Sequence, residues 1–219
     1  MIKKTNIEIE YKYTTDVDEA RVWLNSLPKL FSADFETAVK YSDKVISMAK
    51  DKLKDPNTPK IEKIHYKALV EATPLGHPSH CVITHCSIAI SETFSYVFII
   101  DSDEMHELVT NFLVTTEAVQ IWHNYSYDGR FLRYFTGKDA KNVEDTQILA
   151  KTLINHVETY KAKTGLKELA GSWYGDWGIS SDLFKLSQMY ETKVIKYAGI
   201  DACATFKLWT YMQEYIGNA

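Results

Sequence analysis

Long apolar runs are absent from this 219-residue sequence: no segment approaches the roughly 18 uninterrupted apolar residues that a membrane-spanning helix needs. The amino terminus, MIKKTNIEIEYKY, also lacks the apolar centre of a secretory signal. Cysteine is scarce, and Cys81, Cys86 and Cys203 form an odd set without a Cys-x-x-Cys pair, which argues against a disulfide framework. These absences predict a cytoplasmic protein in a reducing compartment, with no membrane partner.

An excess of positive charge is absent as well. The chain holds 25 lysines and arginines against 29 acidic residues, which gives a net charge of -4. It therefore lacks the broad basic surface with which proteins grip duplex nucleic acid tightly. A polyanionic substrate would need a local source of positive charge, such as bound metal ions.

Apolar residues make up 45% of the chain, enough for one sizeable core, and the length favours a single domain over residues 1–219. Apolar patterning predicts strands over 6–13, 30–36, 81–90, 95–100 and 118–124. Helical spacing predicts helices over 16–27 and 103–113, from about 127, and over 145–154, 165–175 and 192–216. Asp145 is expected to cap the helix that it begins, and Gly175 to end its helix in the left-handed conformation. This order of elements predicts an α/β fold in which helices cover a mixed sheet.

Residues 39–78 differ in composition from the rest of the chain. The segment is rich in Lys, Asp and Pro, and short apolar groups flank the sequence DPNTP. It is expected to be an insertion of one or two surface helices around a loop. Its lysines, at positions 40, 44, 50, 52, 54, 60, 63 and 67, indicate a role in binding the substrate or a partner.

Two acids stand one residue apart in the sequence FSADFETAVK. Successive side chains of a strand alternate between faces, so Asp34 and Glu36 point the same way. In an apolar setting one of them would take up a proton unless a cation joined them. If the strand end faces water, both are simply solvated, and the pair alone does not decide between these cases.

Two later segments carry further candidates. Asn124 and Asp128 stand where a strand gives way to a helix, a place where sheet folds assemble ligand sites, although a turn amide and a helix cap would use the same residue types. Tyr197 and Asp201 share one face of the last helix, and that face is otherwise apolar. A buried acid there needs a partner, which is either a Lys or Arg side chain or a metal ion.

The candidate site residues thus include four carboxylates: Asp34, Glu36, Asp128 and Asp201. Carboxylates are the hard oxygen ligands that Mg2+ and Mn2+ favour, and four of them neutralise two divalent ions. Two such ions stabilise the attacking and the leaving oxygen of an in-line displacement at phosphorus. The set indicates a two-metal phosphodiester hydrolase, whose ions supply the positive potential that the chain lacks.

The motifs ADFET, HNYSYDGRFL and YAGIDACAT, in this order, resemble those of the DEDD superfamily of 3′-5′ exonucleases, in the subclass with Tyr-x-x-x-Asp in the third motif. The resemblance is to the proofreading domain of A-family DNA polymerases, and it covers nearly the whole chain apart from residues 39–78. It implies a ribonuclease H-like fold, a mixed five-stranded sheet with helices on its faces.

The resemblance also implies roles for individual residues. Asp34, Glu36 and Asp201 would bind the first metal ion. Asp34 would bridge to the second ion, which Asp128 would hold through water. Tyr197 and Glu36 would orient the attacking water. Contacts to the 3′-terminal nucleotide are implied for three further residues, Phe35, Thr37 and Asn124.

The implied function is metal-dependent release of nucleoside 5′-monophosphates from the 3′ end of single-stranded or frayed DNA, with Mg2+ or Mn2+ as cofactor. The chain would then work in proofreading, replication or repair beside a separate DNA polymerase or another replication protein, either as a stand-alone bacterial or viral enzyme or as an excised domain. Two alternatives stay open: an exoribonuclease of the ribonuclease D type, and a non-catalytic subunit that docks to a polymerase.

Two other groups of residues also have side chains that bind metal ions or bases in other proteins. Five zinc-ligand types lie close together in the sequence: His77, His80, Cys81, His85 and Cys86. Their spacing fits no closed zinc pattern, and strand alternation places them on opposite faces. The sequence GSWYGDWG could stack bases, but Trp173 fits the core stripe of its helix, which leaves Trp177 as the candidate for substrate contact.

Overall fold

The computed structural model describes residues 7–40, 43–72, 78–79, 81–154, 163–175, 177 and 186–217. Within these residues, six strands form one sheet in the order β1-β4-β3-β2-β5-β6. Their bounds are Glu10–Thr14 (β1), Leu30–Val39 (β2), Cys81–Ala89 (β3), Phe94–Ile99 (β4), Val119–Trp122 (β5) and Asn142–Asp145 (β6). β3 runs antiparallel to β2 and β4, and the other neighbouring strands are parallel. The predicted mixed α/β sheet is confirmed.

The sixth strand, β6, is the one that the five-stranded prediction omits. It pairs with β5, and its sequence, NVED, holds a single apolar residue. Periodicity needs several apolar side chains, so a four-residue edge strand of this kind leaves no signal. Its last residue, Asp145, caps the following helix as predicted, because its Oδ1 accepts from the backbone N–H groups of Gln147 (2.8 Å) and Ile148 (3.3 Å).

The helices are α1 (Val17–Asn25), α2 (Asp43–Lys54), α3 (Lys60–Ala72), α4 (Asp103–Thr115), α5 (Tyr125–Thr136), α6 (Thr146–Ile154), α7 (Leu166–Tyr174) and α8 (Thr192–Gly217), with a short 3-10 helix, η2, at Leu186–Gln188. α7 ends at Gly175, where φ is 74° and ψ is -155°. This is a region that glycine alone adopts readily, but it is not the left-handed helical conformation that the sequence predicted. No described helix has the length and the apolar character that crossing a membrane requires.

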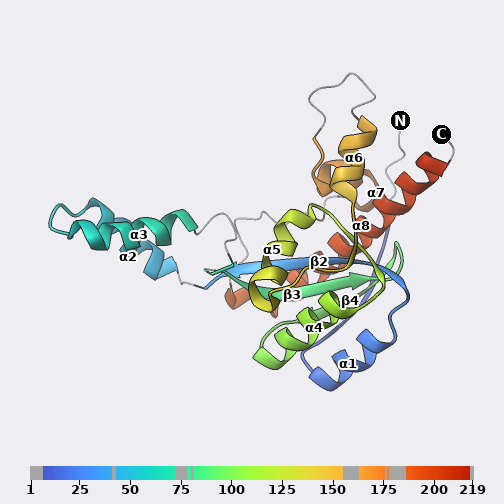
Figure 1. Ribbon diagram of the computed structural model, residues 1–219, viewed down its shortest axis with the longest axis horizontal. Coiled ribbons are helices and arrows are strands. Elements are labelled where there is room, and N and C mark those ends of the chain that lie inside the picture. Colours follow the sequence, from blue (N-terminus) through green and yellow to red (C-terminus); the bar gives the residue numbers. More distant parts are fainter. Residues whose placement is uncertain are drawn as a thin grey trace.

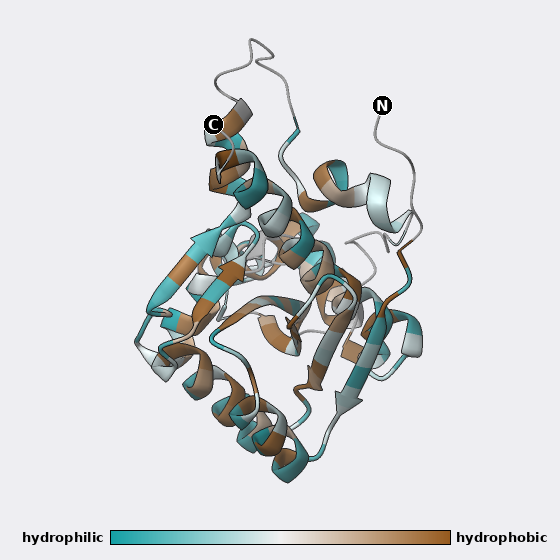
Figure 2. Ribbon diagram, turned by 90° about the vertical axis from the view of Figure 1, so that its right-hand side faces the viewer, coloured by the Kyte–Doolittle hydropathy of each residue, from teal (hydrophilic) through white to brown (hydrophobic). Residues whose placement is uncertain are grey.

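β2 sorts its side chains onto the two faces of the sheet. Phe31, Ala33 and Phe35 belong to a core shared with α1, α4 and α5. The residues between them face the other side, where Ser32 Oγ donates to the carbonyl of Ala202 on α8 at 2.7 Å. Residues of α6, α7 and α8 form a second core on that side. The hydrophobic stretches of the strands accordingly lie between helices in Figure 2.

Small residues let α8 approach the sheet closely. Its small buried residues are Ala198, Gly199, Ala202, Cys203 and Ala204. A Cβ atom on Gly199 would lie 2.8 Å from Ser95 Oγ on β4, and 3.4 Å from Ile9 Cδ1. The room that these small side chains leave is therefore filled by the sheet, and the close packing sets Asp201 beside β2.

Residues 43–72 form an arm that projects away from the sheet (Figure 1). The arm consists of α2, α3 and the loop between them. The two helices pack mainly against each other, and Ala49 and Leu69 are buried in them. β2 ends at Val39, which pairs with Cys81 at the start of β3. The arm therefore emerges from the same strand that carries the first acidic motif.

Candidate metal-binding active site

The candidate site starts on β2, in the sequence ADFET. Asp34 and Glu36 alternate with the core residues Ala33 and Phe35, so both carboxylates point to the face that α8 covers. After Glu36 the pairing with β3 shifts by one residue, and Thr84 Oγ1 donates to the Glu36 carbonyl at 3.1 Å. Such a β-bulge bends the strand locally and changes the direction of its side chains, which is why bulges are frequent beside functional sites.

Asp201 joins this pair from α8. Carboxylate oxygens of Asp34, Glu36 and Asp201 all lie within 4.8 Å of one another, and we call these residues the three-acid cluster. Glu36 is 9% exposed and Asp201 is 8% exposed. The structure thus brings together three of the predicted site residues from two elements that are far apart in the sequence.

Burial and mutual repulsion dominate the electrostatics of the three-acid cluster. Burial raises the pKa of Asp34, and the charge of Glu36 raises it further. Burial is also the main cause of the raised pKa values of Glu36 and Asp201. The Oε1 atom of Glu36 is buried without a hydrogen-bond partner, which is costly for a polar atom unless a ligand binds it. A divalent cation would satisfy this oxygen and hold the acids in their ionised form, so the residues fit a metal ion.

Asp128 lies at the edge of the cluster, in the first turn of α5. Its side chain is 3% exposed, and its Oδ1 accepts a hydrogen bond from the backbone N–H of Phe35 at 3.2 Å. Burial raises the pKa of Asp128 to about 8, and the bond to Phe35 opposes that rise. Asp128 is not one of the three clustered ligands, yet its charge raises the pKa of Asp34. Its role as a ligand of a second ion stays a prediction.

Tyr197 and Lys167 add a hydroxyl group and a cation to the site. Tyr197 stands one turn before Asp201 on α8 and is 6% exposed. Burial, and then the charge of Asp201, raise the pKa of Tyr197, so its hydroxyl stays protonated at neutral pH. Lys167 on α7 donates from Nζ to this hydroxyl, and its Nζ lies 4.5 Å from the centre of the tyrosine ring. Its charge lowers the pKa values of all three clustered acids.

Trp177 belongs to the interior of the site. It is 9% exposed, and its Nε1 donates to Asp201 Oδ1 at 2.5 Å. Burial raises the pKa of Asp201, and this bond, after the charge of Lys167, lowers it. The ring also packs edge-on against Tyr174 of α7, with 5.7 Å between the ring centres. Contact of Trp177 with the substrate stays a prediction, and the structure adds that its indole N–H binds a predicted metal ligand.

Sequence reasoning missed Lys167 and the contact made by Trp177, because neither residue stands in one of the three motifs that carry the predicted site acids. The predicted contacts to a terminal nucleotide are Phe35, Thr37 and Asn124, and each already has a partner within the protein. The N–H of Phe35 donates to Asp128. Thr37 Oγ1 lies 2.8 Å from the hydroxyl of Tyr127. Asn124 has a left-handed backbone (φ 63°, ψ 52°), and its N–H donates to Asp145 at 3.0 Å. Nucleotide binding by these residues would use other atoms or exchange these bonds.

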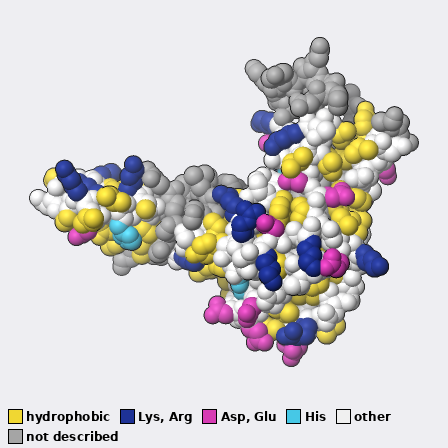
Figure 3. Space-filling model, in the orientation of Figure 1, with side chains coloured by type: hydrophobic (Ala, Val, Ile, Leu, Met, Phe, Trp, Pro, Cys, Tyr) yellow, Lys and Arg dark blue, Asp and Glu magenta, His cyan; other side chains and the backbone are white. Residues whose placement is uncertain are grey.

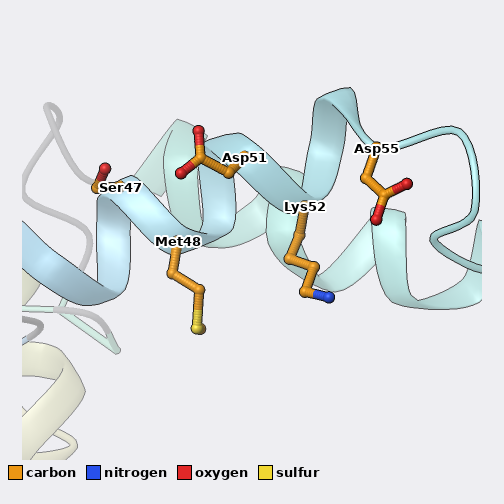
Figure 4. A pocket seen from close by; sticks show the side chains of 5 residues that line it. All are labelled: Ser47, Met48, Asp51, Lys52 and Asp55. Atoms are coloured by element: carbon orange, nitrogen blue, oxygen red, sulfur yellow. The ribbon is translucent and has the colours of Figure 1, made fainter.

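Two other places in the structure lack the features of this site. A hollow on the arm is lined by Ser47, Met48, Asp51, Lys52 and Asp55. Figure 4 shows Asp51 pointing away from Met48 and Lys52, so these side chains do not converge.

The zinc-ligand types do not assemble either, as far as the structure describes them. His77 and His80 lie outside the described residues. The Nε2 atom of His85 lies 2.7 Å from the carbonyl of Met189, and Cys86 is fully buried. Among the described residues, the three-acid cluster is the group that could hold a metal ion.

The fold and the site together define a class of protein: an α/β protein with clustered, buried carboxylates suited to metal-dependent chemistry. A family model described as 3′-5′ exonuclease matches residues 70–216, more than half of the sequence. The chain belongs to this 3′-5′ exonuclease family. The matched range contains Asp128, Tyr197 and Asp201, whereas Asp34 and Glu36 precede it. No curated protein matches the chain.

Solved structures share the fold at low sequence identity. Brucella melitensis NrnC with bound Mg2+ has a TM-score of 0.56 and 14% identity, over 98% of this chain and 83% of NrnC. The Aedes aegypti Nibbler EXO domain has a TM-score of 0.64 and 8% identity, over 97% and 93%. Trypanosoma brucei RNase D, in its complex with GMP, has a TM-score of 0.58 and 13% identity, over 92% of this chain and 56% of the relative. The likeness to these structures confirms the predicted ribonuclease H-like fold.

Proposed function

We propose that this 3′-5′ exonuclease removes nucleoside 5′-monophosphates from the 3′ end of single-stranded or frayed DNA, with two Mg2+ or Mn2+ ions. The observation that carries the proposal is the three-acid cluster, in which Glu36 Oε1 is buried without a hydrogen-bond partner. A phosphodiester is an anion, and these carboxylates would repel it unless cations lay between them. The cluster therefore supports hydrolysis at phosphorus with metal ions bound.

Each residue of the site has a distinct part in this mechanism. Asp34, Glu36 and Asp201 would hold the first ion, and Asp34 and Asp128 the second. When bound, the two ions supply an activated water and neutralise charge on the phosphate. Tyr197 keeps its proton because its pKa is raised, so its hydroxyl orients the water and does not act as the base. Lys167 fixes that hydroxyl through its hydrogen bond.

The preference for single-stranded DNA rests on the charge of the chain and on the resemblance of its motifs. A net charge of -4 does not suit tight binding of duplex DNA. A confined site also admits a terminal base only when that base is unpaired. The motifs resemble those of proofreading domains, which favours DNA as the substrate and a role in proofreading or repair beside a separate polymerase.

An exoribonuclease is the second candidate function, and the structural relatives favour it. RNase D of Trypanosoma brucei was solved with GMP, and NrnC of Brucella melitensis was solved with pGG. Since the fold of these proteins matches over nearly the whole chain, RNA is the alternative substrate that a test must include.

The test compares 5′-labelled single-stranded DNA and RNA of matched sequence, with Mg2+ and with a chelator. We expect stepwise shortening from the 3′ end, faster on DNA and absent with the chelator. Asp34→Ala and Asp201→Ala should each abolish release of mononucleotides and leave the circular dichroism spectrum unchanged. Asp18→Ala, an exposed acid on α1, is the matched control. Faster cleavage of RNA would refute the DNA assignment, and full activity of both site variants would refute the site.

A proofreading role has its own test. Duplex DNA with a mismatched 3′ end frays more than a matched duplex, so the mismatched end should be shortened faster. Equal rates on the two duplexes would argue against proofreading while leaving the exonuclease activity in place.

A further inference from the structure

The arm differs from the rest of the molecule in the sign of its charge. Residues 43–72 hold seven lysines and five acidic residues, a charge of +2. The whole chain carries -4, so the remainder of the protein carries -6. An element that concentrates positive charge on an otherwise acidic protein is complementary to an anionic partner.

Three lysines of the arm are exposed to such a partner. Lys50 and Lys54 are exposed and one turn apart on α2, and Lys60 is exposed at the start of α3. Lys54 and Lys60 flank the loop between the two helices, so they place charge at the outer end of the arm (Figure 1). Figure 3 shows Lys side chains gathered along one edge of the arm.

Exposed aliphatic side chains lie on the same helices. Ile61 is 77% exposed and Ile64 is 68% exposed, and these two residues are neighbours on the surface of α3. A duplex covers the faces of its bases by stacking, whereas a single strand exposes them. A surface with both lysines and aliphatic groups therefore suits the phosphates and the unpaired bases of a single strand.

The position of the arm agrees with this partner. Val39, where β2 ends, is three residues beyond Glu36, which is about 10 Å along a strand. α2 then extends for twelve residues, about 18 Å. A strand whose 3′ end lies in the three-acid cluster can thus reach the arm with the nucleotides that precede that end.

We propose that the arm binds the single-stranded nucleic acid upstream of the 3′-terminal nucleotide and so holds the substrate while the site cleaves it. The proposal rests on the function proposed above. It adds a binding surface that lies outside the three-acid cluster and consists of α2, α3 and the loop between them.

The experiment measures binding without cleavage. Fluorescence anisotropy with a chelator present gives the affinity for single-stranded DNA and RNA of about twenty nucleotides at several salt concentrations, because the salt dependence counts the phosphates that are neutralised. The test variant is the triple change Lys50→Ala, Lys54→Ala and Lys60→Ala. The matched control removes three exposed lysines of the main body, Lys12→Ala, Lys29→Ala and Lys138→Ala.

We expect the arm variant to bind the long strand about tenfold more weakly, and the slope of log affinity against log salt to shrink by about 2, since each phosphate contact to a single strand contributes roughly 0.7. The body variant should behave like the wild-type protein. A trinucleotide, which occupies only the site, should be cleaved at the wild-type rate by the arm variant with Mg2+. A further variant, Ile61→Ser with Ile64→Ser, should weaken binding without changing the slope.

Equal affinities and slopes for the arm and body variants would overturn the proposal, and so would a wild-type protein that binds neither long strand. A change in self-association of the arm variants, with unchanged nucleic-acid binding, would overturn it in favour of a protein partner. The proposed function fails separately, because loss of that function would appear as a wild-type protein that binds the strand but does not cleave it.

Discussion

Trp177→Phe tests whether an indole N–H controls the metal affinity of the site. The substitution keeps an aromatic ring against Tyr174 but removes the donor to Asp201 Oδ1. Asp201 must be ionised to bind a cation, and the lost bond favoured its ionised form. We therefore expect the variant to bind Mn2+ more weakly than the wild-type protein at neutral pH.

The structure sets the size of this effect. Trp177 and Asp201 are 9% and 8% exposed, so water screens their bond little. A hydrogen bond to a charged group contributes about 1.5–3 kcal/mol, and about 1.4 kcal/mol corresponds to a factor of ten. Loss of a partner that orients a metal ligand typically lowers metal affinity by about 10- to 100-fold. We expect a loss of at least about tenfold for Trp177→Phe.

The assay is a titration with Mn2+ in which free Mn2+ is measured by electron paramagnetic resonance at several pH values. The Mn2+ affinity of the variant should approach that of the wild-type protein as pH rises, because at higher pH Asp201 is ionised even without the hydrogen bond from Trp177. Trp173→Phe is the control, since Trp173 lies nearby on α7 but packs against Tyr211, with 5.4 Å between ring centres. An unchanged Mn2+ affinity and pH profile in Trp177→Phe, or an equal loss in both variants, would refute the reasoning.

Three further predictions concern stability and catalysis. The pKa values of the site acids are raised, to about 8 for Asp128, so their ionisation opposes folding without metal, and the metal-free melting temperature should fall as pH rises from about 4 past 8. The pKa of His85 is lowered to about 4, so this residue has the opposite effect on stability at acidic pH. The measured quantity is therefore the rise in melting temperature that Mg2+ causes at each pH, and this rise should grow with pH. Lys167→Met should lower kcat about tenfold at unchanged KM, because it removes the donor that positions the tyrosine hydroxyl, and Lys167→Arg should recover part of the rate. Wild-type kcat in the methionine variant would contradict this. Gly199→Val should lower the free energy of unfolding, measured in urea, by about 1–3 kcal/mol, because the new Cβ atom would lie 2.8 Å from Ser95 Oγ. An unchanged urea midpoint would contradict the close packing of α8 on the sheet.

Elements with a strong periodic signal were predictable from the sequence, and those without one were not. β2 was expected because apolar residues alternate with Ser32, Asp34 and Glu36, and the same alternation gives the face on which the acids lie. β6 was missed because four residues with one apolar side chain have no period. The contacts of Lys167 and Trp177 were missed for another reason: they depend on how α7 and the residue Trp177 beyond it pack against α8, and no local pattern encodes tertiary packing.

The distribution of charge over the molecule explains how an acidic protein could bind a polyanionic substrate. The sequence shows only that the net charge is -4, and it predicts that bound metal ions must compensate for this. At physiological ionic strength, salt largely screens the interaction between charges that are more than about 8 Å apart. Ions in the three-acid cluster therefore attract the scissile phosphate and hardly attract phosphates further along the strand. β2, the strand that leads to the arm, ends about 10 Å from Glu36, and the net charge of the arm is positive. Metal ions and lysines would then serve different stretches of one substrate, so removal of the arm should weaken the binding of long strands and leave the chemistry at the 3′ end unchanged.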